Sequence, residues 1–252
     1  MNKFARMMDV LDLFSGQATL LRAEDIAERL EVSRPTAFRY AAELCAAGFL
    51  ANYSGSYSLG ARIITLDYRI RESDPVLRIA RPAMRELAAD MVGSAILCRM
   101  FNEDVINVHQ EEVKHEEGAI HGRGQPLPLF RGSASKVMLA FMPTPKVKKI
   151  YERHTDDPGA QAIGRDWNAF SAALKEIRRK GFYVSIREVS QDRVGIAAPI
   201  TLPGTGAVAV LSLVLPVERL SFINPDGVGQ KVMSCTREIS HQLERATDGC
   251  ST

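Results

Sequence analysis

Residues Ala23–Gly60, AEDIAERLEVSRPTAFRYAAELCAAGFLANYSGSYSLG, decide the fold of the N-terminal part of this chain. Apolar residues at helical spacing predict a short helix that ends near Leu30. Ser33 is a good N-cap for a second helix, Pro35 fits its first turn, and the apolar pattern continues to about Ala47. Two helices joined by such a short turn are typical of a helix-turn-helix that binds DNA.

The flanking segments extend this unit to a winged helix-turn-helix. The stretch VLDLF at 10–14, followed by Ser15-Gly16, predicts a first helix with a glycine at its C-terminal end. Phe49–Tyr53 and Tyr57–Leu59 flank Ser54-Gly55-Ser56 and predict a β-hairpin, the wing. The alternative is an ordinary helical hairpin packed into a larger core. The polar tip of the predicted hairpin favours the wing.

The charge of this segment argues against nucleic acid at first sight. Net charge is +2 for the chain, and residues 1–60 hold six Lys/Arg against seven Asp/Glu. Between Val32 and Ala42, however, the charged residues are Arg34 and Arg39 alone. A groove-facing surface can therefore be basic although the unit around it is not.

The expected DNA contacts lie on the second helix and the wing. Arginine pairs with guanine through two hydrogen bonds, small methyl groups contact the thymine methyl, and hydroxyl groups reach phosphates. We therefore expect the helix to contact DNA through Ser33, Arg34, Thr36, Ala37, Arg39 and Tyr40, and the wing through Asn52, Tyr53, Ser54 and Ser56.

The remainder of the chain predicts a separate α+β domain. We expect a winged helix-turn-helix over 1–60, a linker helix over 61–73 that breaks at Ser73-Asp74-Pro75, and a second domain over 74–247. In that domain the patterns predict helices over 75–91, 133–141, 146–153, 167–180 and 225–246, and strands over 95–101, 105–110, 182–187, 195–200 and 207–215. Helices that flank several antiparallel strands make an α+β sheet domain.

Composition narrows the class of protein. The chain has 252 residues, 46% of them hydrophobic, and no stretch reaches the ~18 uninterrupted apolar residues of a membrane span. The four cysteines form no C-x-x-C pair, which favours a reduced, cytoplasmic protein. Because no P-loop or dinucleotide fingerprint occurs, we expect no cofactor.

Two patterns raise the possibility of chemistry. Ser133-Ala-Ser-Lys136 matches the S-x-x-K pattern of β-lactamase-like enzymes, but the companion S-D-N and K-T-G patterns do not occur. A helix start with a solvated lysine explains it better, and we expect no catalytic residue. His109, His115 and His121, with Glu111, Glu112, Glu116 and Glu117, could offer metal ligands, but a six-residue spacing suits neither a helix face nor a strand face. We expect a solvated charged loop and no metal.

Arg131-Gly132-Ser133 has a further use at the predicted helix start. Free N–H groups and the helix dipole favour an anion such as a carboxylate there. Simple capping by Ser133 explains the same residues equally well. The residues alone leave both explanations open.

Segments in a fixed order give the chain a family resemblance. VLDLF, DIAERLEVSRPTAFRYAAELCAAGFL and YSLG are followed by PLPLFRGSASKVMLA, KGFYVSIREV, RVGIAAPI and VLSLVLPVERL. Over nearly its whole length the chain resembles the IclR family of bacterial transcription regulators. The resemblance implies a winged-helix domain, a GAF-like α/β effector domain, and homodimers, often paired into tetramers, on palindromic operators. It also implies a small organic acid as effector, and we expect a regulator and not an enzyme.

The resemblance further implies where the effector binds. Carried over from the family's motifs, the cavity residues are Leu127, Ser133, Ala134, Ser185, Gly195, Val210, Ser212 and Val214. This chain departs from the family pattern at Ser135, where a glycine is usual, at Ser185, where some members have an acid, and at Val214, where some have a serine. A less polar cavity predicts a larger, partly apolar carboxylate, and we expect an aromatic one.

These observations predict a ligand-responsive, sequence-specific DNA-binding regulator, repressor or activator. The alternatives are a serine-nucleophile hydrolase that carries an accessory winged helix, with Ser133 and Lys136 as nucleophile and base, and a winged helix used for protein contacts. A steep salt dependence of DNA affinity would separate the last from a DNA-binding unit, because phosphate contacts release counterions.

Overall fold

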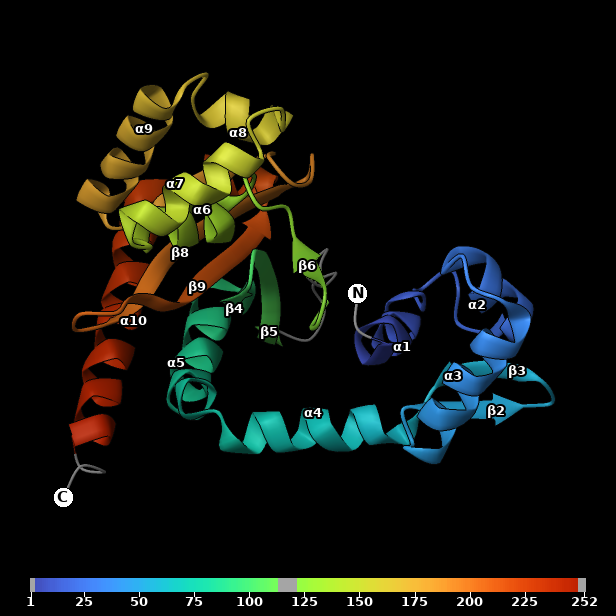
Figure 1. Ribbon diagram of the computed structural model, residues 1–252. Helices are drawn as coiled ribbons and strands as arrows, with labels where there is room; N and C mark the ends of the chain where they lie inside the picture. The colour runs from blue at the N-terminus through green and yellow to red at the C-terminus, as the bar shows by residue number, and fades with distance from the viewer. Residues whose placement is uncertain (1–2, 113–121, 249–252) are drawn as a thin grey trace. The chain divides into compact units, whose positions relative to one another are not determined.

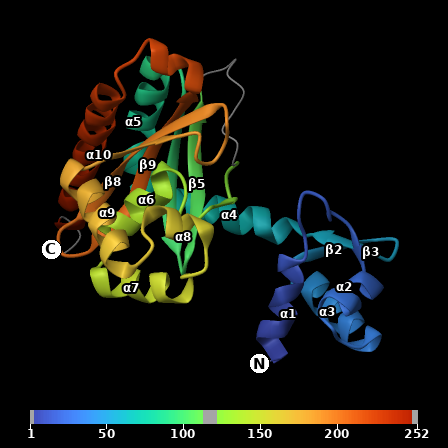
Figure 2. The same ribbon diagram turned by 90° about the horizontal axis from the view of Figure 1, so that it is seen from above.

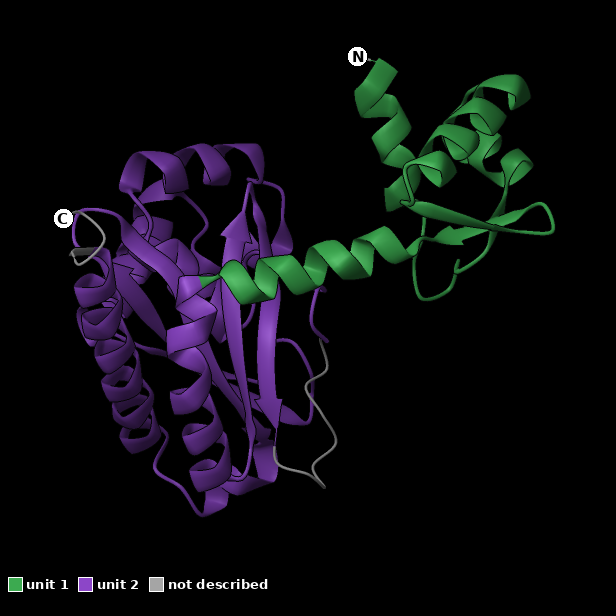
Figure 3. Ribbon diagram, turned by 90° about the horizontal axis from the view of Figure 1, so that it is seen from below, with its two compact units in different colours: residues 1–74 green, residues 75–252 purple. Residues whose placement is uncertain are grey.

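The chain divides into two compact units in a computed structural model that describes residues 3–112 and 122–248 (Figure 3). Residues 1–74 form the first unit and residues 75–252 the second. The division falls between Asp74 and Pro75, so the linker helix belongs to the first unit.

The first unit is a winged helix-turn-helix (Figure 1). Its helices and strands are, in chain order, α1 (Lys3–Asp12), β1 (Leu21–Arg22), α2 (Ala23–Arg29), α3 (Arg34–Ala46), β2 (Leu50–Tyr53), β3 (Ser56–Leu59) and α4 (Ala61–Ser73). The described strands form one antiparallel sheet in the order β1-β3-β2. Strand β1 was not predicted, because two residues are too short to show an alternating pattern.

Helical periodicity builds the core of this unit. Ala37, Tyr40, Ala41 and Leu44 lie on one face of α3, because each is three or four residues from another of them, and all are buried. They pack with buried residues of α1, α2 and the wing. Helix α4 buries none of its residues, and its large apolar side chains Ile64, Tyr68 and Ile70 are exposed.

The second unit is built on an antiparallel sheet. In chain order its elements are α5 (Pro75–Met91), β4 (Ser94–Phe101), β5 (Asp104–Glu112), β6 (Pro126–Leu127), α6 (Ser133–Phe141), α7 (Thr144–Arg153), α8 (Pro158–Ile163), α9 (Trp167–Lys180), β7 (Tyr183–Ile186), β8 (Arg193–Leu202), β9 (Gly206–Pro216), a 3-10 helix (Val217–Ser221) and α10 (Pro225–Asp248). The described strands run in the order β6-β5-β4-β9-β8-β7, each antiparallel to its neighbour. The predicted α+β fold with a mostly antiparallel sheet is confirmed.

Both faces of this sheet are covered by helices (Figure 2). Helices α5 and α10 cover one face, where Met84, Leu211 and Val232 belong to a single buried cluster. Helices α6, α7 and α9 pack over the other face around Val137, Ile150 and Phe170. Alternate side chains of β9 reach opposite clusters, since successive residues of a strand point to opposite faces.

Short elements escaped prediction for a physical reason. Helix α8 spans Pro158–Ile163 only, and its N-cap Asp157 accepts hydrogen bonds from the backbone N–H groups of Gly159 and Ala160. One and a half turns are too short for an apolar repeat to develop.

Within the described residues, no helix is long and apolar enough to cross a membrane.

Candidate functional site

Helix α3 presents an exposed polar face, and the structure corrects two of its predicted DNA contacts. Ala37 is completely buried and Tyr40 is 4% exposed, both in the core of the winged-helix unit. The prediction that they contact DNA is wrong. The stripe that packs α3 onto the core lies on the side of the helix opposite exposed Arg39, so these residues serve the fold.

The remaining helix candidates lie at the start of α3 and are accessible. Ser33, Arg34 and Arg39 are exposed, and the hydroxyl groups of Ser33 and Thr36 lie 2.9 Å apart. Arg34 pairs with Glu24 at 3.6 Å and Arg39 with its neighbour Glu43 at 3.9 Å. Exposed pairs of this kind are weak, so either guanidinium can exchange its carboxylate for a phosphate or a base.

Phe38 is a further exposed residue on this face that the sequence analysis missed. Its side chain is 52% exposed, although an aromatic residue on an amphipathic helix is ordinarily assigned to the core. The signal was available in the pattern, because Phe38 falls out of step with the buried stripe of α3.

The wing residues divide between shaping the turn and facing solvent. Asn52 Oδ1 accepts a hydrogen bond from the Gly55 N–H at 3.0 Å, and Ser54 and Gly55 both have positive φ angles. Asn52 therefore fixes the turn. Tyr53 is 62% exposed beside it, while Ser56 is half-buried and pairs with Tyr53 across the hairpin.

The second unit holds a cavity of about 80 Å³ between the start of α6 and the sheet. Seven residues predicted to bind the effector line it, namely Leu127, Ser133, Ala134, Ser185, Gly195, Ser212 and Val214. Val210 does not line it. Val210 is completely buried in the cluster beneath α6, since the cavity opens farther along β9, at Ser212 and Val214.

Further residues of the cavity wall were not among the predicted effector contacts, although Arg131 and Gly132 belong to the anion site expected at this helix start. They come from β4, from the loop before α6, from α6 itself, from the segment between β7 and β8, and from the first residue of β8: Ile96, Cys98, Arg131, Gly132, Ser135, Glu188, Val189, Ser190 and Arg193. The separation of the others along the chain gave no spacing to recognise. The stretch KGFYVSIREV ends at Glu188 and Val189, so the resemblance covered them without giving them a role.

Two glycines let the cavity walls approach closely. Gly132 precedes α6 with φ +85°, and a Cβ there would lie 2.7 Å from Val189 Cγ2. A Cβ on Gly195 of β8 would lie 2.6 Å from Ser133 Oγ. Ser133 and Ser212 share a hydrogen bond of 3.0 Å between their hydroxyl groups. Larger side chains at either glycine would enter the space that a ligand requires.

A carboxylate already lies at the start of α6. Glu188 Oε2 accepts hydrogen bonds from the Gly132 N–H at 3.0 Å and from Lys136 Nζ at 2.6 Å, and Oε1 accepts one from the Tyr183 hydroxyl at 2.8 Å. Burial raises the pKa of Glu188, but the bonds from Lys136, Gly132 and Tyr183 outweigh burial and hold this pKa below its ordinary value. Glu188 is therefore ionised at neutral pH.

Two small groups of the wall differ in what they offer a ligand. Ser135 is completely buried, and its Oγ has no hydrogen-bond partner among the described residues. Burial raises the pKa of the Cys98 thiol to about 12, so Cys98 is a neutral, apolar part of the wall. The cavity thus combines serine hydroxyl groups with an apolar surface.

The geometry does not supply the pair that the S-x-x-K pattern would need for hydrolysis. Lys136 Nζ contacts Glu188 and donates to the Tyr183 hydroxyl at 3.1 Å, while Ser133 is paired with Ser212. The contacts of Lys136 thus go to Glu188 and Tyr183, whereas a serine nucleophile needs its base within hydrogen-bond reach.

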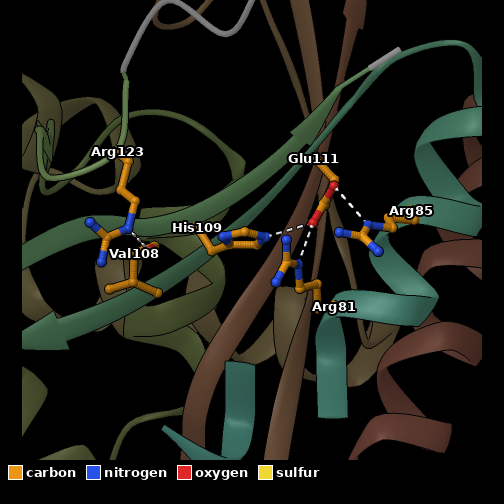
Figure 4. A network of polar contacts seen from close by, with 6 residues as sticks. All are labelled: Arg81, Arg85, Val108, His109, Glu111 and Arg123. Carbon is orange, nitrogen blue, oxygen red and sulfur yellow. Dashed lines mark hydrogen bonds and ion pairs between the residues drawn. The ribbon is translucent and has the colours of Figure 1, made fainter. Parts of the chain in front are cut away.

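The described part of the His/Glu-rich stretch forms an ion-pair network instead of a metal site (Figure 4). Glu111 of β5 accepts hydrogen bonds from Arg81 Nε at 3.0 Å and Arg85 Nε at 3.2 Å, and His109 Nε2 lies 2.9 Å from its Oε1. Burial raises the pKa of Glu111, and the bonds from His109, Arg81 and Arg85 outweigh it, so that pKa is lowered. Arg123 donates to the Val108 carbonyl oxygen at 2.6 Å.

The metal hypothesis receives no support from the described residues, which contain no group of three or more His, Cys, Asp or Glu placed to hold a metal ion. His115, Glu116, Glu117 and His121 lie outside the described residues.

Comparison with known families decides the class. Residues 5–52 match the model described as IclR helix-turn-helix domain, and residues 70–241 match the model described as bacterial transcriptional regulator IclR C-terminal. The chain belongs to the IclR family of transcriptional regulators. The resemblance read from the sequence is confirmed.

Curated relatives of this IclR-family chain match it along most of their length. It is 22% identical to the Pca regulon regulatory protein of Pseudomonas putida over 96% of this chain and 84% of that protein. It is 25% identical to the glycerol operon regulatory protein of Streptomyces griseus over 95% of this chain and 94% of that protein.

Solved structures share the fold of this IclR-family chain. An IclR transcriptional regulator from Alicyclobacillus acidocaldarius superposes with a TM-score of 0.79 at 22% identity, over 95% of this chain and 97% of that one. An IclR homolog from Microbacterium hydrocarbonoxydans, complexed with 4-hydroxybenzoate, superposes with a TM-score of 0.77 at 22% identity, over 97% of this chain and all (100%) of that one.

Proposed function

We propose that this IclR-family regulator binds a palindromic operator through the start of α3 and the wing, and that an aromatic carboxylic acid controls this binding from the cavity beside α6. The observation that carries the proposal is the cavity itself. It places serine hydroxyl groups and the start of a helix opposite apolar side chains.

The DNA contacts follow from exposure. Arg34, the first residue of α3, and Arg39, on the side of α3 away from the buried stripe, are both exposed, and Ser33 and Thr36 lie at the N-terminus of the helix. Arginines can pair with guanine in the major groove, and the hydroxyl groups and free N–H groups of the helix start can bind phosphate. The exposed side chains of Tyr53 and Ser54 in the wing then contact the flanking backbone.

The effector class follows from the wall. Ile96, Leu127 and Val214 offer an apolar surface that suits a ring, and the start of α6 suits a carboxylate. A related fold binds 4-hydroxybenzoate, which has both parts. We therefore take 4-hydroxybenzoate as the first ligand to measure.

A second copy of the chain completes the proposed regulator. A palindromic operator requires two α3 helices one helical turn or a multiple of it apart. The exposed Ile64 and Tyr68, four residues apart on one face of α4, supply an apolar surface that a second copy can cover, as a dimer or within a tetramer. Effector binding can alter DNA affinity only if it favours one of two arrangements of these copies. The regulator would act in the cytoplasm, where its DNA lies.

The test is selection followed by titration. The protein would be used to select its preferred sequences from random duplex DNA. The most enriched duplex would then be labelled and titrated with the protein by fluorescence anisotropy, with and without 4-hydroxybenzoate. We expect a two-fold symmetric site and a change of operator affinity of about fivefold or more with the acid. Failure to select any sequence would contradict the DNA proposal, and an unchanged affinity would contradict the effector proposal.

A further inference from the structure

The Glu188 carboxylate lies where the carboxylate of a ligand would bind. It has the partners that such a ligand would take: the N–H group before α6, the ammonium of Lys136 and the hydroxyl of Tyr183. A helix start with a cation beside it favours one negative charge, and this chain supplies that charge itself.

The size of the cavity points to the same conclusion. A cavity of about 80 Å³ is smaller than the roughly 150 Å³ that holds a benzene molecule in a protein interior. Glu188, Val189 and Ser190 form one of its walls. The cavity therefore has less room than a ring needs, and the segment with Glu188 is the wall outside the sheet, α6 and the loop before α6.

The segment that carries Glu188, residues 187–192, is fixed at its base by a backbone hydrogen bond and at its tip by contacts with the start of α6. It connects β7 to β8 and begins at Arg187, whose φ of +58° is a conformation that residues other than glycine rarely adopt. The Arg187 N–H donates to the Arg193 carbonyl oxygen at 3.0 Å and closes the segment at its base. At the tip of the segment, Glu188 accepts a hydrogen bond from the Gly132 N–H, and Val189 packs beside Gly132 at the start of α6.

The cavity wall also includes Ser135, whose buried hydroxyl group has no hydrogen-bond partner among the described residues. Ser135 is completely buried and lies two residues after Ser133. Buried hydroxyl groups without partners are costly, so a ligand that reached Ser135 once the wall had moved would gain free energy from a hydrogen bond to this hydroxyl group.

We propose that Glu188 is an internal competitor of the effector: a carboxylate ligand displaces the Glu188 side chain from Gly132 and Lys136, and the segment 187–192 then withdraws from the cavity. The proposal rests on the proposed function in one respect, that the cavity takes a carboxylate. The exchange conserves charge, because Lys136 trades one carboxylate for another and Glu188 moves into water.

The proposal fixes how Glu188 affects affinity. If a ligand must displace a bound group, only the molecules that have already released this group can bind it. The apparent Kd is then the intrinsic Kd divided by the fraction of such molecules. Glu188→Gln replaces a charged acceptor by a neutral one of the same shape, and neutral hydrogen bonds are about half as strong. Tyr183→Phe removes one donor to Glu188 and also the hydroxyl that accepts from Lys136 at 3.1 Å. Tyr183 does not line the cavity, so its effect on a ligand passes through these two side chains.

The experiment is calorimetric titration of the full chain, without DNA, with 4-hydroxybenzoate and separately with pyruvate. We expect Glu188→Gln to bind the acid about tenfold more tightly than the unmodified chain, and Tyr183→Phe about two- to threefold more tightly. The matched control is Glu176→Gln, which removes one negative charge from the exposed surface of α9 and leaves the affinity unchanged.

Hydrogen exchange of the same proteins tests the movement. The Arg187 N–H, which donates to the Arg193 carbonyl oxygen at 3.0 Å, should exchange slowly in the free chain, faster when the acid is bound, and fast in Glu188→Gln without any ligand. Slower exchange on binding, or a Glu188→Gln variant that binds no better than the unmodified chain, would overturn the proposal. So would the absence of binding of either acid by every variant.

The outcomes separate this proposal from the proposed function. Binding of pyruvate in place of 4-hydroxybenzoate would contradict an aromatic effector, while the Glu188→Gln and Tyr183→Phe comparison would still decide the role of Glu188. Selection of operator DNA does not depend on either variant.

Discussion

The two units build their candidate sites in opposite ways. The DNA-contact candidates fall within 24 consecutive positions, residues 33–56, and helical periodicity decides which of those on α3 face solvent. The cavity gathers residues from Ile96 to Val214, which become neighbours only through the sheet and α6. A local site depends on the stability of one small unit, whereas an assembled site depends on the fit between distant segments. The predictions below test this contrast.

The largest change in stability is expected at Tyr40, which packs in the core on a helix whose other side is proposed to contact DNA. Tyr40→Ala should lower the free energy of unfolding of the first unit by about 3–5 kcal/mol, because it empties a buried aromatic position. Tyr40→Phe should keep both the fold and the operator affinity. Thermal unfolding and anisotropy would measure the two quantities. If Tyr40→Phe lost operator affinity in a folded protein, Tyr40 would be a DNA contact after all.

The arginines of α3 should show the reverse behaviour. Arg34→Ala and Arg39→Ala should each weaken operator binding by about 1–3 kcal/mol per protomer, and the double variant should lose specific binding while the unfolding transition stays in place. A gel shift with the selected operator measures this, with exposed Arg179→Ala of α9 as the control. Sequence-specific binding by the double variant would remove both residues from the proposed interface.

Gly195 tests the assembled site. Gly195→Ala introduces a methyl group that clashes with Ser133 Oγ, because the two atoms would be only 2.6 Å apart. We expect about tenfold weaker binding of 4-hydroxybenzoate, with operator affinity in the absence of the acid unchanged. Gly227→Ala is the control, because its Cβ would meet Asn224 at an ordinary 3.7 Å. Unaltered ligand affinity in a folded Gly195→Ala protein would place the ligand elsewhere.

The smallest effect concerns the Glu111 network between α5 and β5. The pKa of Glu111 is lowered in the folded chain, so its ionised form adds stability that is complete above the ordinary value of about 4.5 and is lost as pH falls through the lower folded-state pKa. Glu111→Gln should cost about 1–2 kcal/mol at pH 7, and the difference should shrink in acid. Denaturant unfolding at pH 7 and below pH 4.5 checks this. A difference that stays constant with pH would show that the Glu111 charge is not responsible.

Much of the fold was predictable, and the exceptions have physical reasons. Helices such as Pro75–Met91 and Ser133–Phe141 were predicted to the residue, because long apolar repeats have caps or breaks at both ends. Strand β1 and helix α8 are too short to repeat a pattern. Exposure along α3 was the avoidable error, since Tyr40 belongs to the same four-residue stripe as Ala37 and Leu44.

The cavity could be predicted only in part. Family motifs pointed to Ser133 and Ser212, whose hydroxyl groups lie 3.0 Å apart although 79 positions separate them in the chain. No spacing in the sequence relates Glu188 to Gly132, so its place at the start of α6 could not be predicted. Val210 shows the reverse failure: it shares a strand with Ser212 but is buried beneath α6 in the cluster below the cavity.

The sequence by itself determined the winged helix, the α+β class and the family, because periodicity, caps and ordered motifs are local properties that a chain carries before it folds. Tertiary structure alone decided which side chains meet. It buried Tyr40, tied Lys136 to Glu188 instead of Ser133, and put a carboxylate of the chain itself at the start of α6. Such pairings depend on strand register and on the packing of helices over a sheet, and both are fixed only when distant segments exclude water together.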